Sequence, residues 1–214
     1  MNIPYRFMCG EENKTDEIMS IMLQIGLREE TLKRMSGLMI MQLYASFISR
    51  SENPFIIADE ISNLEGTSLR GESRTKSPTM FNRKPFLRGL WHKHYYGSGI
   101  DVMARNLLVA LNNYGLPQLE AKVEEAINSG EERYFTAEDV AMVAFDAVSG
   151  NWERRANEQK ITGHWIIYAI HEGKNFYLSL GKHTDDEAEL RQQIEAICVH
   201  QFPFLTEILC PIPN

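Results

Sequence analysis

Histidines are the residues of this chain best suited to chemistry. The imidazole ordinarily titrates near neutral pH, so it can both accept and donate a proton, and it is also a common metal ligand. What these side chains can do therefore depends on which of them the fold brings together. The chain has six: His92, His94, His164, His171, His183 and His200.

The segment from Ile161 to His183 has the pattern of a β-hairpin. Two runs rich in β-branched and aromatic residues flank Glu172-Gly173, a pair typical of a tight turn. Side chains alternate along a strand, so this turn fixes the register and the two faces. One expected face is apolar: Trp165, Ile167, Ala169, Phe176, Leu178 and Leu180. The expected opposite face holds His164, Ile166, Tyr168, Ile170, Asn175, Tyr177, Ser179 and Gly181, with His183 one step beyond.

The second face has two interpretations. In the first, it is the solvated side of an amphipathic hairpin, which is ordinary for an antiparallel sheet. In the second, it is a catalytic or binding surface. His164 and His183 are then the acid and base, and Tyr168 and Tyr177 assist them. One imidazole would deprotonate a ribose 2′-hydroxyl while the other protonates the leaving oxygen, with no metal ion or cofactor.

A local excess of positive charge points to a phosphodiester substrate. The whole chain carries −7, but Leu69 to His94 contains seven basic residues and one acid. Cationic side chains bind phosphate oxygens, and aromatic rings stack on the bases of single-stranded RNA. The predicted substrate-binding residues are Arg83, Arg88, Trp91, His92, Lys93, His94 and Lys182. The alternative is a solvated charged surface beside a few aromatic residues.

A metal site is a further possibility to weigh against acid–base catalysis. In an extended segment, His92-x-His94 places both imidazoles on one face, where they could bind one ion. The third ligand would be His164, His183 or Asp101. No HExxH or CxxC pattern accompanies the pair. A metal-dependent hydrolase is therefore the third hypothesis, and the preferred one assigns no metal ligands.

The run from Trp165 to His183 resembles the closing strands of RelE-type and related small bacterial toxin ribonucleases. In that family an apolar strand pair ends in a basic Gly-x-His-like segment, which here is Leu180-Gly181-Lys182-His183. The resemblance covers fewer than twenty residues, and it implies RNA cleavage in a toxin or defence system with an antitoxin partner. The helix expected after His183 and the helical first half depart from the compact toxin pattern.

The periodicity of the remaining chain predicts an α+β protein, with a mainly helical N-terminal half and a C-terminal β-β-α unit. We expect a helical part at 1–62, a basic loop rich in Gly, Ser and Pro at 63–84, and an α+β part at 85–214, which could all form one domain. Thr184 and Glu187 match a capping box for the last helix. The other expected helices are 15–24, 28–49, 98–113, 119–128 and 136–150, while 54–61 fits either helix or strand. Thr136 and Asp139 are expected to cap the helix at 136–150.

Composition narrows the class of protein. No apolar run is long enough to span a bilayer, and three widely spaced cysteines predict a reducing compartment, the cytoplasm. No GxxxxGK, GxGxxG or GxSxG pattern indicates a nucleotide cofactor or a serine nucleophile. The expected partner is RNA or another protein. The rival to a ribonuclease is a non-catalytic acidic interaction or inhibitor protein that docks through its helical half.

Overall fold

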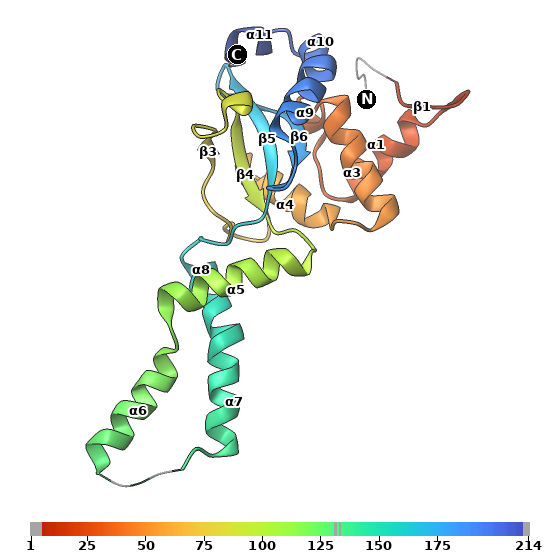
Figure 1. Cartoon of the computed structure of the whole chain (residues 1–214). Coiled ribbons are helices and arrows are strands. Elements are labelled where there is room, and N and C mark those ends of the chain that lie inside the picture. The colour runs from red at the N-terminus through yellow and green to blue at the C-terminus, as the bar shows by residue number, and fades with distance from the viewer. Residues whose placement is uncertain (1–5, 131, 133, 212–214) are drawn as a thin grey trace.

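A four-stranded antiparallel sheet lies at the centre of the protein. The computed structural model describes residues 6–130, 132 and 134–211, and it confirms the α+β class (Figure 1). The strand order is β3-β4-β5-β6, and both neighbours of β5 run antiparallel to it. The strands are β3 (Thr79–Met80), β4 (Trp91–Tyr95), β5 (His164–His171) and β6 (Lys174–Gly181).

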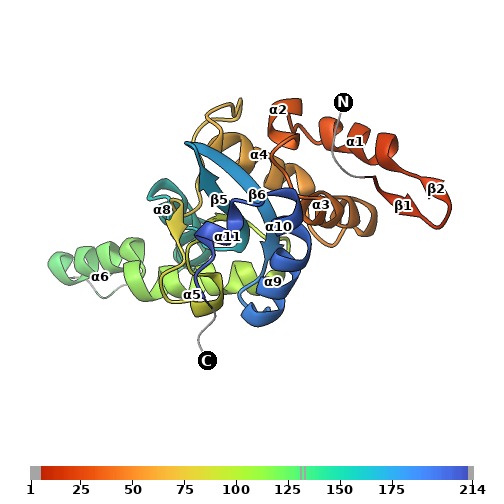
Figure 2. The same ribbon diagram turned by 90° about the horizontal axis from the view of Figure 1, so that it is seen from above.

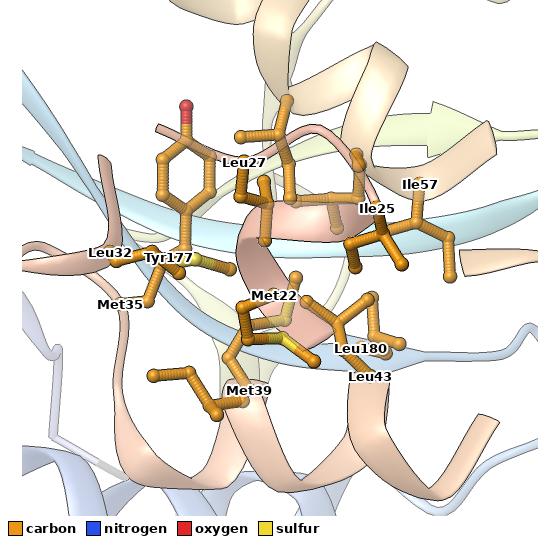
Figure 3. Packing of buried hydrophobic residues seen from close by; sticks show 14 of the residues in the cluster. Met22, Ile25, Leu27, Leu32, Met35, Met39, Leu43, Ile57, Tyr177 and Leu180 are labelled. Atoms are coloured by element: carbon orange, nitrogen blue, oxygen red, sulfur yellow. The ribbon is translucent and has the colours of Figure 1, made fainter. Parts of the chain in front are cut away.

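N-terminal helices cover one face of this sheet. Apolar residues spaced along them meet Ile166, Tyr168, Tyr177 and Leu180, and we call this cluster the N-terminal core (Figure 3). Its remaining members are supplied mainly by the helices and include Ile18, Met22, Leu32, Met39, Leu43, Ile57 and Ile61. The elements are α1 (Thr15–Gln24), α2 (Glu29–Leu32), α3 (Gly37–Ser49) and α4 (Pro54–Leu64), preceded by a small ladder of β1 (Met8–Cys9) and β2 (Glu12–Asn13).

C-terminal elements cover the other face. Leu190, Ile194 and Cys198 pack against the sheet as their helical spacing predicts, and the cluster that they form with it is the C-terminal core. Its sheet residues are Trp165, Ile167, Ala169 and Leu178. The covering elements are the 3-10 turn η1 (Pro85–Leu87), α9 (Glu187–Gln193), the π-helix η3 (Ile194–Cys198), α10 (Val199–Gln201) and α11 (Leu205–Ile208).

The connection between β4 and β5 is a long helical excursion. It projects away from the sheet, and α6 lies on the opposite side of the molecule from α1 (Figures 1 and 2). Thr136 and Asp139 form the capping box of α7, as predicted. The elements are α5 (Ile100–Tyr114), α6 (Pro117–Ser129), α7 (Ala137–Phe145), the π-helix η2 (Asp146–Gly150) and α8 (Asn151–Asn157).

Several expected boundaries were wrong. The helix predicted over 28–49 is two helices, because Ser36 ends the first segment and caps α3 by accepting a hydrogen bond from the backbone N–H of Met39. Residues 54–61 are helical. The last helix is capped by Asp186, not Thr184, and the helix expected to end at Gly150 continues to Asn157.

The hairpin register is right near the turn and wrong beyond it. Tyr168 pairs with Tyr177 as expected, but Ile167 pairs with Ser179 because a β-bulge inserts one residue. The bulge moves Leu180 to the face that was expected to be polar. The N-terminal helices bury the middle of that face, including Ile166, Tyr168 and Tyr177, so this part of it is neither solvated nor open to a substrate.

Ser36 joins α3 to the outer edge of the sheet. Its backbone N–H donates to Tyr177 O at 2.8 Å, and its buried hydroxyl donates to Leu178 O at 2.6 Å. The same hydroxyl accepts from Met39 N at 3.0 Å. Ser36 therefore supplies hydrogen-bond partners to backbone groups of an edge strand and of a helix start. Backbone groups at such places otherwise remain unpaired.

We predict that Ser36→Ala lowers the free energy of unfolding by about 1–3 kcal/mol, because it removes a cap and leaves a buried carbonyl without its donor. Urea denaturation followed by circular dichroism measures the change. Ser49→Ala is the matched control, since Ser49 is exposed on the last turn of the same helix. Equal midpoints for the two variants would contradict the role assigned to Ser36.

Candidate functional site

A pocket of about 320 Å³ opens at one end of the sheet. Tyr95 ends β4, His164 begins β5 and Gly181 ends β6, and the pairing of these strands brings all three to the same end. The first turn of α5 and the residues before α4 close the other sides. The charged and titratable lining residues are Glu52, Asp101, Arg105, His164, Lys182 and His183.

His164 is held in the pocket wall by a carboxylate. Its Nε2 lies 3.4 Å from Glu52 Oε1, and only 8% of the residue is exposed. Glu52 is itself fixed, because its Oε2 accepts from Ser98 N at 2.9 Å and its Oε1 lies 3.6 Å from Lys182 Nζ. The Nδ1 atom of His164 is buried and has no hydrogen-bond partner. The imidazole is thus oriented through one nitrogen and left unpaired at the other.

Burial and Glu52 act on the pKa of His164 in opposite directions. Burial dominates and lowers this pKa below the ordinary value of 6.5, because the imidazolium form loses hydration. The carboxylate of Glu52 favours the charged form and opposes the decrease, whereas Lys182 adds to it. The pKa of His164 is therefore set mainly by burial, and Glu52 limits the decrease.

Two glycines let the chain pass close to this histidine. A side chain at Gly163 would collide with the carbonyl oxygen of Tyr95, and a Cβ at Gly97 would lie 2.6 Å from Cδ2 of His164. The segment after β4 therefore packs directly against the start of β5. This close approach places Glu52, Ser98 and the beginning of α5 around the His164 ring.

His183 has a different environment in the same pocket. Its side chain is exposed at the rim, and its ring centroid lies 4.4 Å from that of Trp165 and 5.6 Å from that of His94. Partial burial lowers its pKa below 6.5, and a hydrogen bond to the backbone of Gly163 opposes the decrease. Unlike His164, it has no carboxylate among the groups that raise its pKa.

His92 and His94 stand behind the pocket, in a row of rings on the side of the C-terminal core. The row runs from Phe81 through His92 and His94 to His183, with centroid separations of 4.3, 5.3 and 5.6 Å. Burial lowers the pKa of both inner histidines to about 4, so they are neutral near pH 7 and do not attract phosphate by charge. Nδ1 of His94 also lies 2.9 Å from Gly163 O.

The His92-x-His94 pair lacks the third ligand that a metal site would require. Among the residues that the structure describes, no group of three His, Cys, Asp or Glu side chains is placed to hold a metal ion. The His92 ring instead packs against Trp165, and the His94 ring packs against the ring of His183. The metal-dependent hydrolase therefore receives no geometric support from these residues.

Four other predicted site residues lie on the far side of the sheet. Tyr168 and Tyr177 are buried in the N-terminal core, against which the half-buried Trp91 also packs. The Tyr177 hydroxyl donates to Glu65 Oε1 at 2.6 Å. Lys93 is buried as well, with its Nζ 3.4 Å from Glu60 Oε2 and 2.6 Å from Thr75 Oγ1. Tyr168, Tyr177 and Lys93 are therefore not on an accessible surface, contrary to expectation, and the polar atoms of Tyr177 and Lys93 are used inside the fold.

Arg83 and Arg88 are exposed but do not line the pocket. Both belong to the connection between β3 and β4. In the same connection, Lys84 forms an ion pair with Glu187, and its Nζ lies 5.5 Å from the Trp165 ring centroid. The basic segment therefore does not bring Arg83 or Arg88 to the pocket. Of the predicted residues, the structure brings together His164, His183 and Lys182.

Sequence reasoning missed Glu52 and Arg105. Arg105 follows Asp101 by four positions, and this charged spacing on an amphipathic helix after Gly97-Ser98-Gly99 was a usable signal. Glu52 gave no comparable signal, because it is separated from His164 by more than a hundred residues of chain. Only the folded arrangement shows that the two side chains meet.

Comparison with known protein families, with curated proteins and with solved structures found no match to this chain. The resemblance to RelE-type toxins therefore rests on Trp165–His183 alone. Within the described residues, none of the helices has both the length and the apolar character needed to cross a membrane.

We predict that Glu52→Gln lowers the pKa of His164 further below 6.5, because the variant removes the charge that favours the imidazolium form. Titration of the histidine ring resonances by NMR measures this shift. Glu120→Gln on α6 is the control, since it removes the same charge outside the pocket lining. A His164 pKa that is unchanged, or equally changed by both variants, would refute the pairing.

Proposed function

We propose that this protein cleaves phosphodiester bonds in RNA by histidine acid–base catalysis, without a metal ion or cofactor. One observation carries the proposal: His164 and His183 line the same pocket as two cationic side chains, Lys182 and Arg105. Two imidazoles in different environments supply an acid and a base, and the cations can bind the phosphate between them.

The surroundings of the two histidines suggest their roles. His183, at the exposed rim, acts as the base and removes the proton of the ribose 2′-hydroxyl. The resulting oxygen attacks phosphorus and forms a 2′,3′-cyclic phosphate as the bond to the 5′ oxygen breaks. His164 donates its proton to that leaving oxygen, because Glu52 favours its protonated form. Each proton has a donor and an acceptor, and no further reactant is needed.

Charge in the pocket favours a phosphate bound near the start of α5. Arg105 and Lys182 supply positive charge, and the N-terminus of α5 presents backbone N–H groups with no side-chain cap. Glu52 lies between Lys182 and His164 and orients both. Asp101 lies in the first turn of α5 and is a further polar contact for the ribose.

The cellular setting is part of the same proposal. A metal-independent ribonuclease of this kind fits a bacterial toxin or defence role, in which an antitoxin or other protein partner would restrain it. The free cysteines Cys9, Cys198 and Cys210 fit a reducing compartment, which would be the cytoplasm.

We predict that the purified protein cleaves single-stranded RNA in excess EDTA and leaves a 2′,3′-cyclic phosphate. His164→Ala and His183→Ala should each lower the rate about 10²–10⁴-fold, because each removes one of the two proton-transfer groups. DNA of the same sequence should survive, since it lacks the attacking hydroxyl. Gel assays with mass spectrometry of the products measure these outcomes.

His200→Ala is the matched control for the two pocket variants, because His200 is exposed on α10 and does not line the pocket. Cleavage that requires an added divalent ion would favour the metal-dependent hydrolase. Activity that survives both pocket substitutions, or no cleavage under any condition, would reject the proposal. The acidic interaction protein would then become the leading alternative.

We further predict a bell-shaped dependence of kcat/KM on pH with its maximum below about pH 6.5. Catalysis needs one neutral and one protonated imidazole, and the pKa of both histidines is lowered from 6.5. Activity should therefore already be falling at pH 6.5, because the acid loses its proton at a pKa below this value. A maximum well above pH 7 would contradict this assignment.

A further inference from the structure

The second feature of interest is the helical arm, by which we mean residues 117–150, with α6, α7 and η2. It projects from the body of the protein (Figure 1), and α6 buries none of its residues. Apolar side chains on the arm are nevertheless exposed: Val123, Ile127, Tyr134, Phe135, Val140 and Phe145. Ile127 is 72% exposed and Tyr134 88%, so the arm leaves uncovered the kind of surface that normally marks an interaction site.

These residues shape a groove at the distal end of the arm. A hollow of about 340 Å³ lies between α6 and the start of α7, and its apolar lining includes Val123, Ile127, Tyr134 and Phe135. The lining side chains come from both helices and from the segment that joins them. A partner helix that inserts apolar side chains at positions i, i+3 or i+4 would fit a groove of this kind.

The charge around the groove defines the chemistry of the partner. Residues 117–150 contain eight acidic and two basic residues, of which Asp139 and Asp146 are buried in the fold. Glu120, Glu124 and Glu138 are exposed, and Lys122 in the groove lining pairs with Glu125. An anionic lipid surface or a nucleic acid would be repelled by this rim. The arm of a second copy of the chain carries the same negative charge and would be repelled too. A helix with Lys or Arg beside its apolar stripe would match both the apolar lining of the groove and the negative charge around it.

We propose that the helical arm is a docking site for a basic amphipathic helix of a partner protein. The apolar stripe of that helix would cover Ile127 and Phe135, and its cations would face the glutamates of the rim. This binding site is separate from the pocket at the end of the sheet, and it stands whether or not the chain cleaves RNA.

Two synthetic 18-residue peptides test the proposal: an amphipathic Leu/Lys helix and a matched Leu/Glu helix. Fluorescence anisotropy with the full chain should show binding of the Leu/Lys peptide that weakens with salt, and no binding of the Leu/Glu peptide. Ile127→Ser combined with Phe135→Ser should weaken Leu/Lys binding at least about tenfold, because the net charge is unchanged while the apolar contact is lost.

Ile48→Ser is the matched control, since Ile48 is 60% exposed on α3 and lies outside the arm. Circular dichroism should show native helicity for all variants, because the substituted side chains are exposed. If the wild type and the arm variant bound the Leu/Lys peptide with equal affinity, negative charge alone would account for the binding. That result would overturn the proposal. A dimer that dissociates in the arm variant would overturn it as well, because the occupant would be a second copy.

Discussion

The structure depends on one constraint, which is that β5 is paired along both edges and is buried on both faces from Trp165 to Ala169. β4 and β6 pair with its two edges, and its side chains alternate between two cores. Ile166 and Tyr168 enter the N-terminal core, whereas Trp165 and Ile167 enter the C-terminal core. Helices from both ends of the chain must therefore reach the same strand.

The pocket exists because this coverage stops at the first residue of β5. Residues further along the strand are enclosed by helices on both faces, but His164 meets a loop, a helix start and the end of β6. Polar groups from Glu52 and Ser98 replace apolar contacts there. Nδ1 of His164 is buried without a hydrogen-bond partner among the described residues, as are Nδ1 of His92, Nε of Arg155 and Nε1 of Trp165.

The sequence correctly predicted features that depend on neighbouring residues, and it missed features that depend on contacts between residues far apart in the chain. The turn at Glu172-Gly173 and the capping box at Thr136 follow from their own residues, and both were correctly expected. The bulge beside Leu178 was not foreseeable, because alternation assumes that no extra residue interrupts the ladder. Tyr177 looked like a surface residue because its acceptor, Glu65, lies 112 positions away in the chain. Glu52 was missed for the same reason, because its partner His164 lies more than a hundred positions away in the chain.

The base of the helical arm shows how its exposed groove can be held ready for a partner. Asp146 is fully buried, pairs with Arg154 and accepts from Gln118 N at 3.1 Å, while Asn151 donates to Gly115 O at 3.1 Å. These bonds tie the start of α6 to η2 and α8 and so hold the base of the arm in place. A preformed groove loses less conformational entropy on binding than one that must first assemble. The polar anchor thus explains how the arm can leave its apolar residues uncovered and still present them in a defined geometry.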